Sequence, residues 1–458
     1  MSAVLAEAFV STKSVPLAEA VEFNPKPERA SIPEALEVSF VPMAAVEAAS
    51  GRMDPTQART YGGVKKGFTY FRDGDVLFAK ITPCMENGKM AVAHGLHNGI
   101  GFGSTEFHVL RPREGVDARY VYYFVSSATF RREAAHHMTG AVGQKRVPLS
   151  FLQQSELPLP PLKQQQRIVD GIEKQFSRLD EAVANLQRVK ANLKRYKAAT
   201  LEAAIEGRLV PTEADVSRLE GRGYESGGEL LGKLIAKRTS RLVDRGKVAP
   251  PIEPDAEVLA PVPEGWCWAS LDQLSTVVRG GSPRPAGDPR YFGGPIPWIT
   301  VGPITADESD YLRATPGGLT EAGKERSRHI EAHTLLLTNS GATLGVPKIA
   351  LIAGCINDGV AALLDVDYPL KSYLVQFLRT KTAAMRNINQ GAAQPNLNTT
   401  IIKATAVPLP PLAEQHRIVA EVDRRLSIAR EVEAEVDANL KRAQALRQAV
   451  LQRAFASP

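Results

Sequence analysis

A proline-rich stretch that occurs twice constrains this chain more than any other feature of its sequence. Leu157-Pro158-Leu159-Pro160-Pro161-Leu162 is matched 250 positions later by Val407-Pro408-Leu409-Pro410-Pro411-Leu412. Both copies lead into Gln-x-Arg-Ile-Val, at residues 165–169 and 415–419, and the offset continues without a gap to Leu201 and Leu451. Solenoid repeats have periods of a few tens of residues. The chain is therefore predicted to contain one large module twice.

Each proline-rich stretch, which we call a strap, is predicted to be an extended connection between a globular body and a helix. Its prolines cannot donate backbone hydrogen bonds, and they bias their neighbours toward extended conformations. Pro161 is tolerated where a helix begins, because the N–H groups of the first helical turn have no partners there.

A long helix is predicted after each strap. The first, roughly Lys163 to Glu206, contains no proline, and its apolar residues recur every seven positions, which is a coiled-coil period. At about 1.5 Å per residue, each helix would be about 60 Å long. So narrow an apolar stripe does not stabilise a lone helix, so the two helices are predicted to pair. The residues predicted to form the pairing seam are Ile172, Leu179, Leu186, Leu193, Val422, Val436, Leu446 and Val450.

Length and composition indicate a soluble protein of two or three domains. The chain has 458 residues, of which 43% are hydrophobic and 23% charged, and its net charge of +6 leans mildly toward polyanionic partners. No apolar run is long enough to span a bilayer, and residues 1–15 do not resemble a signal peptide, so a cytoplasmic location is predicted. Cys84, Cys267 and Cys355 are odd in number and far apart, which predicts neither a disulfide framework nor a metal site.

The chain is predicted to consist of five segments. Residues 1–155 form a first globular body and residues 156–207 the first strap and helix. Residues 208–262 form a short helix and a proline-rich linker, residues 263–406 a second body, and residues 407–458 the second strap and helix. Both bodies mix strands and helices in the same outline, but their sequences differ. Two bodies of one fold with different surfaces indicate two different ligands of one kind.

Three segments resemble catalytic or cofactor-binding motifs, but none has the residues that its motif requires. Residues 318–324 have the spacing of a phosphate-binding loop, but Glu325 replaces the Ser or Thr that would bind magnesium. His329 and His333 flank Glu331, whereas a zinc-protease helix needs its Glu directly after the first His. Residues 24–27 lack the aromatic residue of an amino-methyltransferase loop, and no glycine-rich cofactor turn accompanies them. The chain is therefore predicted to be non-catalytic and to hold no cofactor.

The loops of both bodies are rich in residues that suit DNA. Arg and Lys bind phosphates and guanine edges, Asn and Gln pair with adenine, and glycine lets the backbone approach a ligand closely. In the first body, the predicted DNA-binding residues are Lys65, Lys66, Arg72, Lys80, Asn87, Lys89, Gln144, Lys145 and Arg146. In the second body, they are Arg279, Arg284, Arg290, Trp298, Asn339, Lys348, Gln390, Gln394, Asn396 and Asn398.

Over essentially its whole length, the chain resembles the specificity (S) subunit of type I restriction–modification systems. The doubled straps carry most of the resemblance. Residues 203–211, Ala-Ala-Ile-Glu-Gly-Arg-Leu-Val-Pro, and residues 263–266, Pro-Glu-Gly-Trp, add to it. Gly280-Gly281-Ser282-Pro283 together with Pro297-Trp298-Ile299 is also typical of the second body. The second copy departs slightly, with Val407 for Leu157 and a more alanine-rich helix seam.

The resemblance implies an α+β fold with a pseudo-two-fold internal repeat. Two similar mixed α/β target-recognition domains would be held apart by two long antiparallel coiled-coil helices. Each domain would read one half of a bipartite, asymmetric DNA sequence. The subunit would recruit two methyltransferase subunits that use S-adenosylmethionine, and ATP- and magnesium-dependent restriction subunits would be able to join. The alternative is a coiled-coil adaptor whose globular ends bind protein partners. The sequence leaves open which bases are read and how long the unread spacer is.

Overall fold

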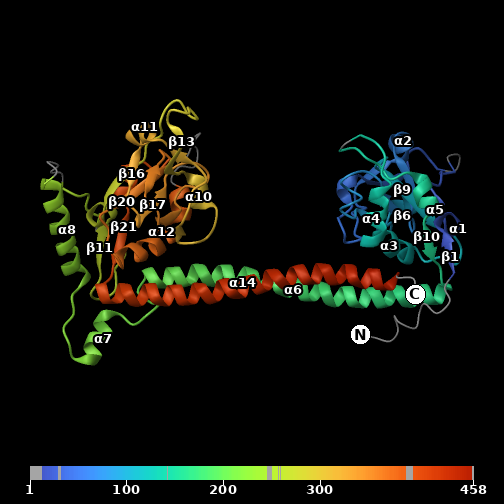
Figure 1. Cartoon of the computed structure of the whole chain (residues 1–458). Coiled ribbons are helices and arrows are strands. Elements are labelled where there is room, and N and C mark those ends of the chain that lie inside the picture. Colours follow the sequence, from blue (N-terminus) through green and yellow to red (C-terminus); the bar gives the residue numbers. More distant parts are fainter. Residues whose placement is uncertain are drawn as a thin grey trace. The chain divides into compact units, whose positions relative to one another are not determined.

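The computed structural model describes residues 13–28, 32–141, 143–244, 250–255, 257, 259–387 and 396–455 (Figure 1). Contacts divide the chain into two compact units. Unit 1 comprises residues 1–189 and 435–458, and unit 2 comprises residues 190–434. Each unit therefore contains one globular body and part of both long helices.

Unit 1 contains ten strands and five short α-helices among its described residues. The strands are β1 (Ser14–Pro16), β2 (Val21–Phe23), β3 (Glu37–Val41), β4 (Ala58–Thr60), β5 (Thr69–Arg72), β6 (Val76–Ala79), β7 (Met90–Val92), β8 (Ile100–Gly103), β9 (Phe107–Pro112) and β10 (Glu156–Pro158). The helices are α1 (Leu17–Ala20), α2 (Tyr61–Val64), α3 (Ala118–Ser126), α4 (Ala128–His136) and α5 (Leu149–Gln154), with 3-10 turns at Met43–Ala45 and His97–Gly99. One sheet has the order β2-β9-β6-β7, a second has the order β4-β3-β8-β5, and β1 pairs with β10.

Unit 2 repeats this design with one extra edge strand. Its strands are β11 (Cys267–Ser270), β12 (Thr276–Arg279), β13 (Phe292–Ile299), β14 (Tyr311–Leu312), β15 (Gly318–Leu319), β16 (Arg328–Ile330), β17 (Thr334–Thr338), β18 (Pro347–Ala350), β19 (Gly354–Ile356), β20 (Val360–Leu364) and β21 (Ala406–Leu409). Its short helices include α9 (Leu271–Leu274), α10 (Val301–Thr305), α11 (Glu321–Glu325), α12 (Leu370–Asn387) and α13 (Thr399–Lys403). The sheets have the orders β12-β20-β17-β18-β14 and β15-β13-β19-β16, and β11 pairs with β21.

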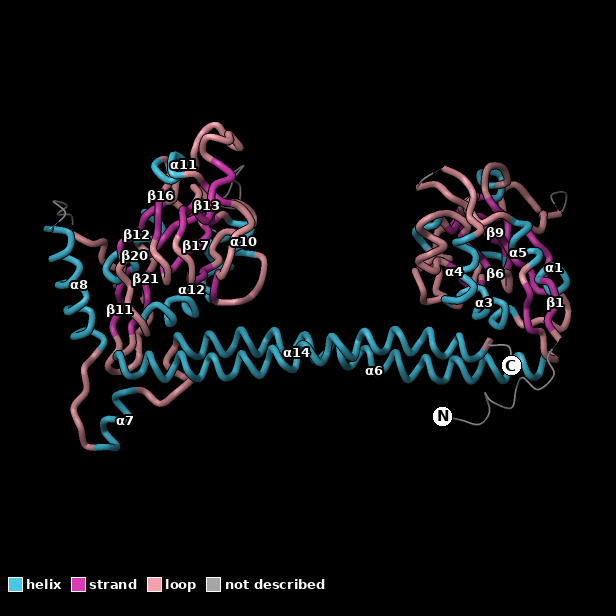
Figure 2. The backbone as a smooth tube through the Cα atoms, viewed as in Figure 1, coloured by secondary structure: helices cyan, strands magenta, loops and turns pink. Residues whose placement is uncertain are grey.

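The two topologies correspond strand by strand. In both units the first sheet places a fully buried strand, β6 or β17, between two antiparallel neighbours, β9 and β7 in unit 1 and β20 and β18 in unit 2. In both units the second sheet contains one parallel pair, β3 with β8 or β13 with β19, flanked by antiparallel edge strands. Figure 2 shows the strands of each unit in magenta. The predicted repeat of one mixed α/β body is confirmed. Unit 1 has two successive helices, α3 and α4, where unit 2 has the single longer helix α12.

The straps are anchored in both units by the same hydrogen bonds. Each strap begins as a strand, β10 or β21, whose first proline carbonyl accepts a bond from a buried tyrosine hydroxyl. The distances are 2.7 Å from Tyr120 to Pro158 and 2.6 Å from Tyr373 to Pro408. Burial raises the pKa of both hydroxyls, which keeps them protonated as donors. Each strap therefore begins in the extended conformation that the sequence predicts, and in addition it pairs with a strand of its own unit.

Two long helices follow the straps, α6 (Leu162–Ile205) and α14 (Leu412–Ala454). In unit 1, Arg447 of α14 bonds to Asp180 of α6 at 2.8 Å, and Ile172 shares a core with Val450. In unit 2, Lys197 of α6 forms an ion pair with Glu433 of α14. Low residue numbers on one helix thus face high numbers on the other, so the helices pair antiparallel within each unit. Among the described residues, no helix is long and apolar enough to cross a membrane.

The residues predicted to form the pairing seam are buried to different degrees. Ile172, Val422, Val436 and Val450 are buried, and Leu179, Leu186 and Leu193 are half-buried. Leu446, predicted to lie in the seam, is instead 52% exposed. Val189, Tyr196 and Val432 are also exposed, whereas Ile168 and Ile418, near the starts of the two helices, are buried. The reason is geometric: a helix has 3.6 residues per turn, so two helices bury only the stripe facing the partner.

Residues 208–244 contain a helix that the sequence analysis missed. Besides the predicted helix, α8 (Gly227–Asp244), the structure has α7 (Glu213–Glu220). The side chain of Thr212 caps α7 by accepting from the N–H of Asp215, and Gly221 ends the helix in the left-handed conformation, φ 64°. Both are ordinary helix-boundary signals that could have been read from the sequence.

Candidate nucleic-acid interface

In unit 1, the loop at residues 139–147, described except for residue 142, is fixed to the end of the buried strand β6. The N–H of Val147 donates to the carbonyl of Lys80 at 2.8 Å, and Val147 itself is buried. Arg146 forms β-bridges with Ile81 and Thr139. The structure therefore brings Lys80, at the end of a predicted strand, next to Gln144, Lys145 and Arg146, which the sequence placed together in a later loop.

Unit 2 anchors its corresponding loop in the same way. The N–H of Leu397 donates to the carbonyl of Asn339 at 2.7 Å, and Asn396 forms a bridge with Ser340. Asn339 thus occupies the position of Lys80. Gln390 and Gln394, predicted in this loop, lie outside the described residues.

Asn339 follows β17 and is buried beneath the point where Leu397 is anchored. It is 0% exposed, and neither Oδ1 nor Nδ2 has a hydrogen-bond partner among the described residues. A buried side-chain amide without partners is uncommon and marks a place where polar contact is available.

Some polar and charged side chains around the unit 1 loop are bonded within the protein, and others are exposed. Arg146 binds Glu106 through two hydrogen bonds, 2.9 Å from Nε and 2.8 Å from Nη2. These bonds lower the pKa of Glu106, so the pair is ionised at neutral pH. Lys145, Gln144 and Asn87 are exposed, whereas Lys89 donates to the carbonyl of Met43 at 3.0 Å.

His108 lies behind the same loop and was not identified from the sequence. Its Nε2 is 3.1 Å from the carbonyl of Val147, and its Nδ1 is 3.5 Å from Nδ2 of Asn24. Burial lowers the pKa of His108, so the ring is neutral near pH 7 and Nε2 must carry the hydrogen that binds Val147. His108 therefore helps to hold the base of the loop.

In unit 2, arginines gather around one acidic residue. Nε of Arg279 donates to the carbonyl of Asp358 at 2.8 Å, and Arg284 lies 3.7 Å from the Asp358 carboxylate. Arg328, which the sequence analysis did not select, donates to the carbonyl of Arg279 at 3.0 Å. Arg326 is exposed on the adjoining turn, where the hydroxyl of Ser327 donates to the carbonyl of Gly281 at 2.7 Å. This arginine cluster (Arg279, Arg284, Arg326 and Arg328) leaves a surplus of positive charge.

Other predicted residues of unit 2 are held by local contacts. Arg290 is bonded to Asp288 through Nε at 3.1 Å and Nη2 at 2.7 Å, which lowers the pKa of Asp288. Trp298 packs edge-on against Phe292, with ring centroids 6.2 Å apart. Oδ1 of Asn398 accepts from the N–H of Ile401 at 2.8 Å and caps α13. Asn398 is therefore occupied as a helix cap.

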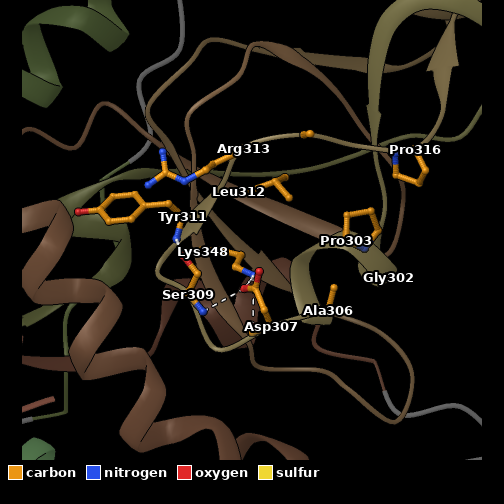
Figure 3. Close-up of a pocket in the computed structure, with 11 residues that line it drawn as sticks. Gly302, Pro303, Ala306, Asp307, Ser309, Tyr311, Leu312, Arg313, Pro316 and Lys348 are labelled. Carbon is orange, nitrogen blue, oxygen red and sulfur yellow. Dashed lines mark hydrogen bonds and ion pairs between the residues drawn. The ribbon is translucent and has the colours of Figure 1, made fainter. Parts of the chain in front are cut away.

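Lys348 lies away from the other predicted residues, in a pocket of about 560 Å³. Its side chain is only 1% exposed, and Nζ is 2.6 Å from Oδ1 of Asp307 (Figure 3). Bonding to Lys348 lowers the pKa of Asp307, which also accepts from the N–H of Ser309 at 2.9 Å. The lysine charge is neutralised inside the protein, so we leave Lys348 out of the proposed interface.

The remaining predicted residues of unit 1 lie near the second sheet. Lys65, at the end of α2, forms an ion pair with Glu34. Lys66 follows it and is exposed, and Arg72 is exposed at the end of β5. They form a group separate from the loop at residues 139–147.

The part of the chain that the structure describes contains no cluster of side chains suited to a metal ion. There, no three His, Cys, Asp or Glu side chains are grouped so that they could hold a metal ion. The polar residues that gather at the strand ends are suited to contact a ligand surface.

Comparison with known protein families finds a match to both globular bodies. The model of the "Type I restriction modification DNA specificity domain" matches twice, at residues 24–194 and 263–441. The chain is 32% identical over 311 residues to the EcoAI specificity subunit of Escherichia coli, covering 58% of this chain and 51% of that protein. It is 25% identical over 478 residues to the EcoEI specificity subunit of Escherichia coli, covering 89% of this chain and 76% of that protein. The chain thus aligns with about half the length of the first relative.

Two solved structures share the fold. A chain from a structure of a type I restriction–modification system superposes with a TM-score of 0.71 at 19% identity, covering 98% of both chains. The HsdS subunit from Thermoanaerobacter tengcongensis gives a TM-score of 0.57 at 21% identity, covering 97% of this chain and 96% of that one. Both confirm the two-body fold with a long helix after each body.

Proposed function

Because this chain belongs to the family of type I restriction–modification DNA specificity domains, we propose that it is the DNA sequence-recognition subunit of such a complex. Each globular body reads one half of a bipartite, asymmetric target. The repeated loop anchor is the observation that carries this proposal. Val147 and Leu397 fix equivalent loops to equivalent strand ends, and different polar side chains surround the two anchors. Such an arrangement suits two readers of different sequences.

The proposed contacts fall into two kinds. Lys65, Lys66, Arg72, Lys80, Lys145 and the arginine cluster of unit 2 supply charge for phosphates, which position a protein without reading sequence. Asn87, Gln144, Asn339, Gln390, Gln394 and Asn396 supply amides, which pair with adenine in the major groove. Engaged side chains such as Arg146 and Arg290 would have to exchange an internal carboxylate for DNA, which lowers their net gain.

The chain itself contributes recognition, and catalysis belongs to its partners. We propose that it assembles with two methyltransferase subunits, which use S-adenosylmethionine to methylate adenine. Restriction subunits that use ATP and magnesium would join the same assembly. The name "specificity subunit" of its relatives favours this function over a protein-binding adaptor. A cytoplasmic location, where chromosomal DNA is accessible, fits this proposal.

Methylome sequencing tests the proposal directly. A strain that carries the chain and its methyltransferase partner should methylate adenines in one bipartite motif, and deletion of the gene for this chain should abolish that motif. The purified complex should bind this DNA specifically, and log affinity should fall with log salt by about 0.9 per neutralised phosphate. Unchanged methylation after deletion, or equal affinity for all sequences, would contradict the proposal and favour the adaptor.

A further inference from the structure

An arginine in unit 1 is held over an aromatic ring at the edge of the second sheet. Arg59 lies in β4 opposite Val38, so its side chain is on the face that also carries Phe40. Its guanidinium carbon is 3.6 Å from the centroid of the Phe40 ring. Phe68 packs edge-on against Phe40, with centroids 4.9 Å apart and planes at 87°. The ring is 6% exposed while Arg59 is exposed, so the aromatic pair forms a fixed platform beneath the guanidinium.

Within the part of the chain that the structure describes, the guanidinium of Arg59 stacks on Phe40 and makes no hydrogen bond. Among the described residues, no carboxylate lies within ion-pair distance of it. Two other exposed or half-buried arginines of unit 1 differ in this respect, since Arg52 is bonded to Glu47 and Arg111 to Asp75. A guanidinium stacked on a ring has lost much of its rotational freedom but retains its N–H donors. Arg59 is therefore oriented for an external planar acceptor.

The strand that carries Arg59 is accessible to a large ligand. β4 is an edge strand, and Ala58, Arg59 and Thr60 are all exposed. β4 pairs with β3, which lies between β4 and β8 in the sheet order, so the other side of β4 is the outer edge of the sheet. The chain continues directly into α2 and then to the exposed Lys66, so a second positive charge lies close in sequence to this edge strand.

We propose that Arg59 reads a guanine in the half-site recognised by unit 1, and that Lys66 contacts a phosphate beside it. This inference rests on the proposed DNA-recognition function. Guanine presents two acceptors, O6 and N7, in the major groove, and a planar guanidinium fork binds both at once. Phe40 is a positioning residue, because its ring fixes the plane of the Arg59 guanidinium. Lysine, a single point charge, does not reproduce this two-point contact.

Two substitutions at Arg59 separate base reading from packing and from charge. R59M keeps an aliphatic stem over Phe40, and R59K keeps the positive charge. In the complex with its methyltransferase partner, both should lose discrimination at one G·C position by roughly 5- to 150-fold, measured by competition with DNA altered at single positions. The other half-site should be unaffected. Thermal unfolding of R59M and R59K checks that unit 1 remains folded.

Two further variants serve as controls. R52M removes an exposed arginine already bonded to Glu47, and it should leave the recognised sequence unchanged. K66A should weaken binding to all sequences alike and reduce the salt slope by about 0.9.

The inference is overturned if R59K discriminates as the wild type does, because Arg59 would then be a charge contact to phosphate. Unchanged discrimination in R59M overturns it as well. A wild-type complex without any sequence preference would instead contradict the proposed function itself, so the two failures are distinguishable.

Discussion

Unit 1 and unit 2 fix their straps to their long helices with matching hydrogen bonds but surround those bonds with different side chains. Nε2 of Gln165 donates to the carbonyl of Pro160 at 2.8 Å, and Nε2 of Gln415 donates to that of Pro410 at 2.9 Å. In unit 1, Oε1 of Gln165 also accepts from the N–H of Asp117 at 2.9 Å.

At the same place, unit 2 has a buried network of charges. Glu414 accepts from Nε1 of Trp266 at 3.0 Å and from the N–H of Glu213 at 2.8 Å. The carboxylate of Glu213 binds Arg417 at 2.6 Å and Arg222 at 2.7 Å. Burial raises the pKa of Glu213, but the hydrogen bonds from both arginines outweigh it and leave the pKa lowered. This network fixes α7 to the start of α14.

The difference teaches which parts of a repeated module are free to vary. Backbone carbonyls of the straps need the same donors in both units, because an unpaired buried carbonyl is costly. The side chains around those bonds are free to differ, because each unit packs different residues against its long helix. Arg167, the counterpart of Arg417, is exposed in unit 1.

Exchanging one body is the strongest test of the independence of the two units. Replacement of residues 1–155 by the equivalent body of a relative should change one half of the methylated motif completely and leave the other half unchanged. The physical reason is that each unit has its own core and its own polar loops. Methylome sequencing reads both halves at once. Altered bases in both halves would show that the units do not read independently.

Breaking the charge network should destabilise unit 2 far more than the matched change destabilises unit 1. E414A leaves the indole N–H of Trp266 and the Glu213 backbone N–H unpaired, at a cost of about 2–4 kcal/mol in the free energy of unfolding. Q164A alters the equivalent position of unit 1 and should cost less than about 1 kcal/mol. Calorimetry of both variants measures this, and tryptophan fluorescence reports on unit 2 because Trp266, Trp268 and Trp298 all lie there. Equal costs would contradict the comparison.

Removing the tyrosine hydroxyls should instead reveal what the units share. Y120F and Y373F each leave a buried proline carbonyl without its donor, and each should cost about 1–2 kcal/mol of unfolding free energy. Denaturant titration of the two variants provides the comparison. A large difference between their losses of unfolding free energy would mean that the two hydroxyl–carbonyl bonds do not stabilise the straps equally.

The smallest expected effect concerns the charge at the unit 1 loop. E106Q removes the carboxylate that holds Arg146, so the guanidinium becomes available to DNA. Affinity for non-specific DNA should rise a few-fold, and the salt slope should steepen by about 0.9 if one phosphate is gained. DNA binding by the wild-type and E106Q complexes at several salt concentrations decides this. Unchanged slopes would mean that Arg146 does not contact phosphate.

Much of the fold could be predicted because its signals are local or repeated. The straps, the long helices and the buried strands β6 and β17 follow from proline positions, the seven-residue period and continuous apolar runs. The helix α7 was missed although Thr212 and Gly221 mark its ends, because its eight residues carry little apolar periodicity. Leu446 was misplaced because periodicity alone does not tell which of two stripes faces the partner helix.

The sequence by itself determined that the chain contains one module twice, and the doubled straps and Gln-x-Arg-Ile-Val segments already indicated its family. Only the tertiary structure decided which polar side chains are available to a ligand. Lys348 is neutralised by Asp307, 41 positions away, whereas Arg59 is left without a carboxylate and oriented by Phe40. The physical reason is that apolar periodicity is written along the chain, while ion pairing and stacking depend on residues that folding brings together.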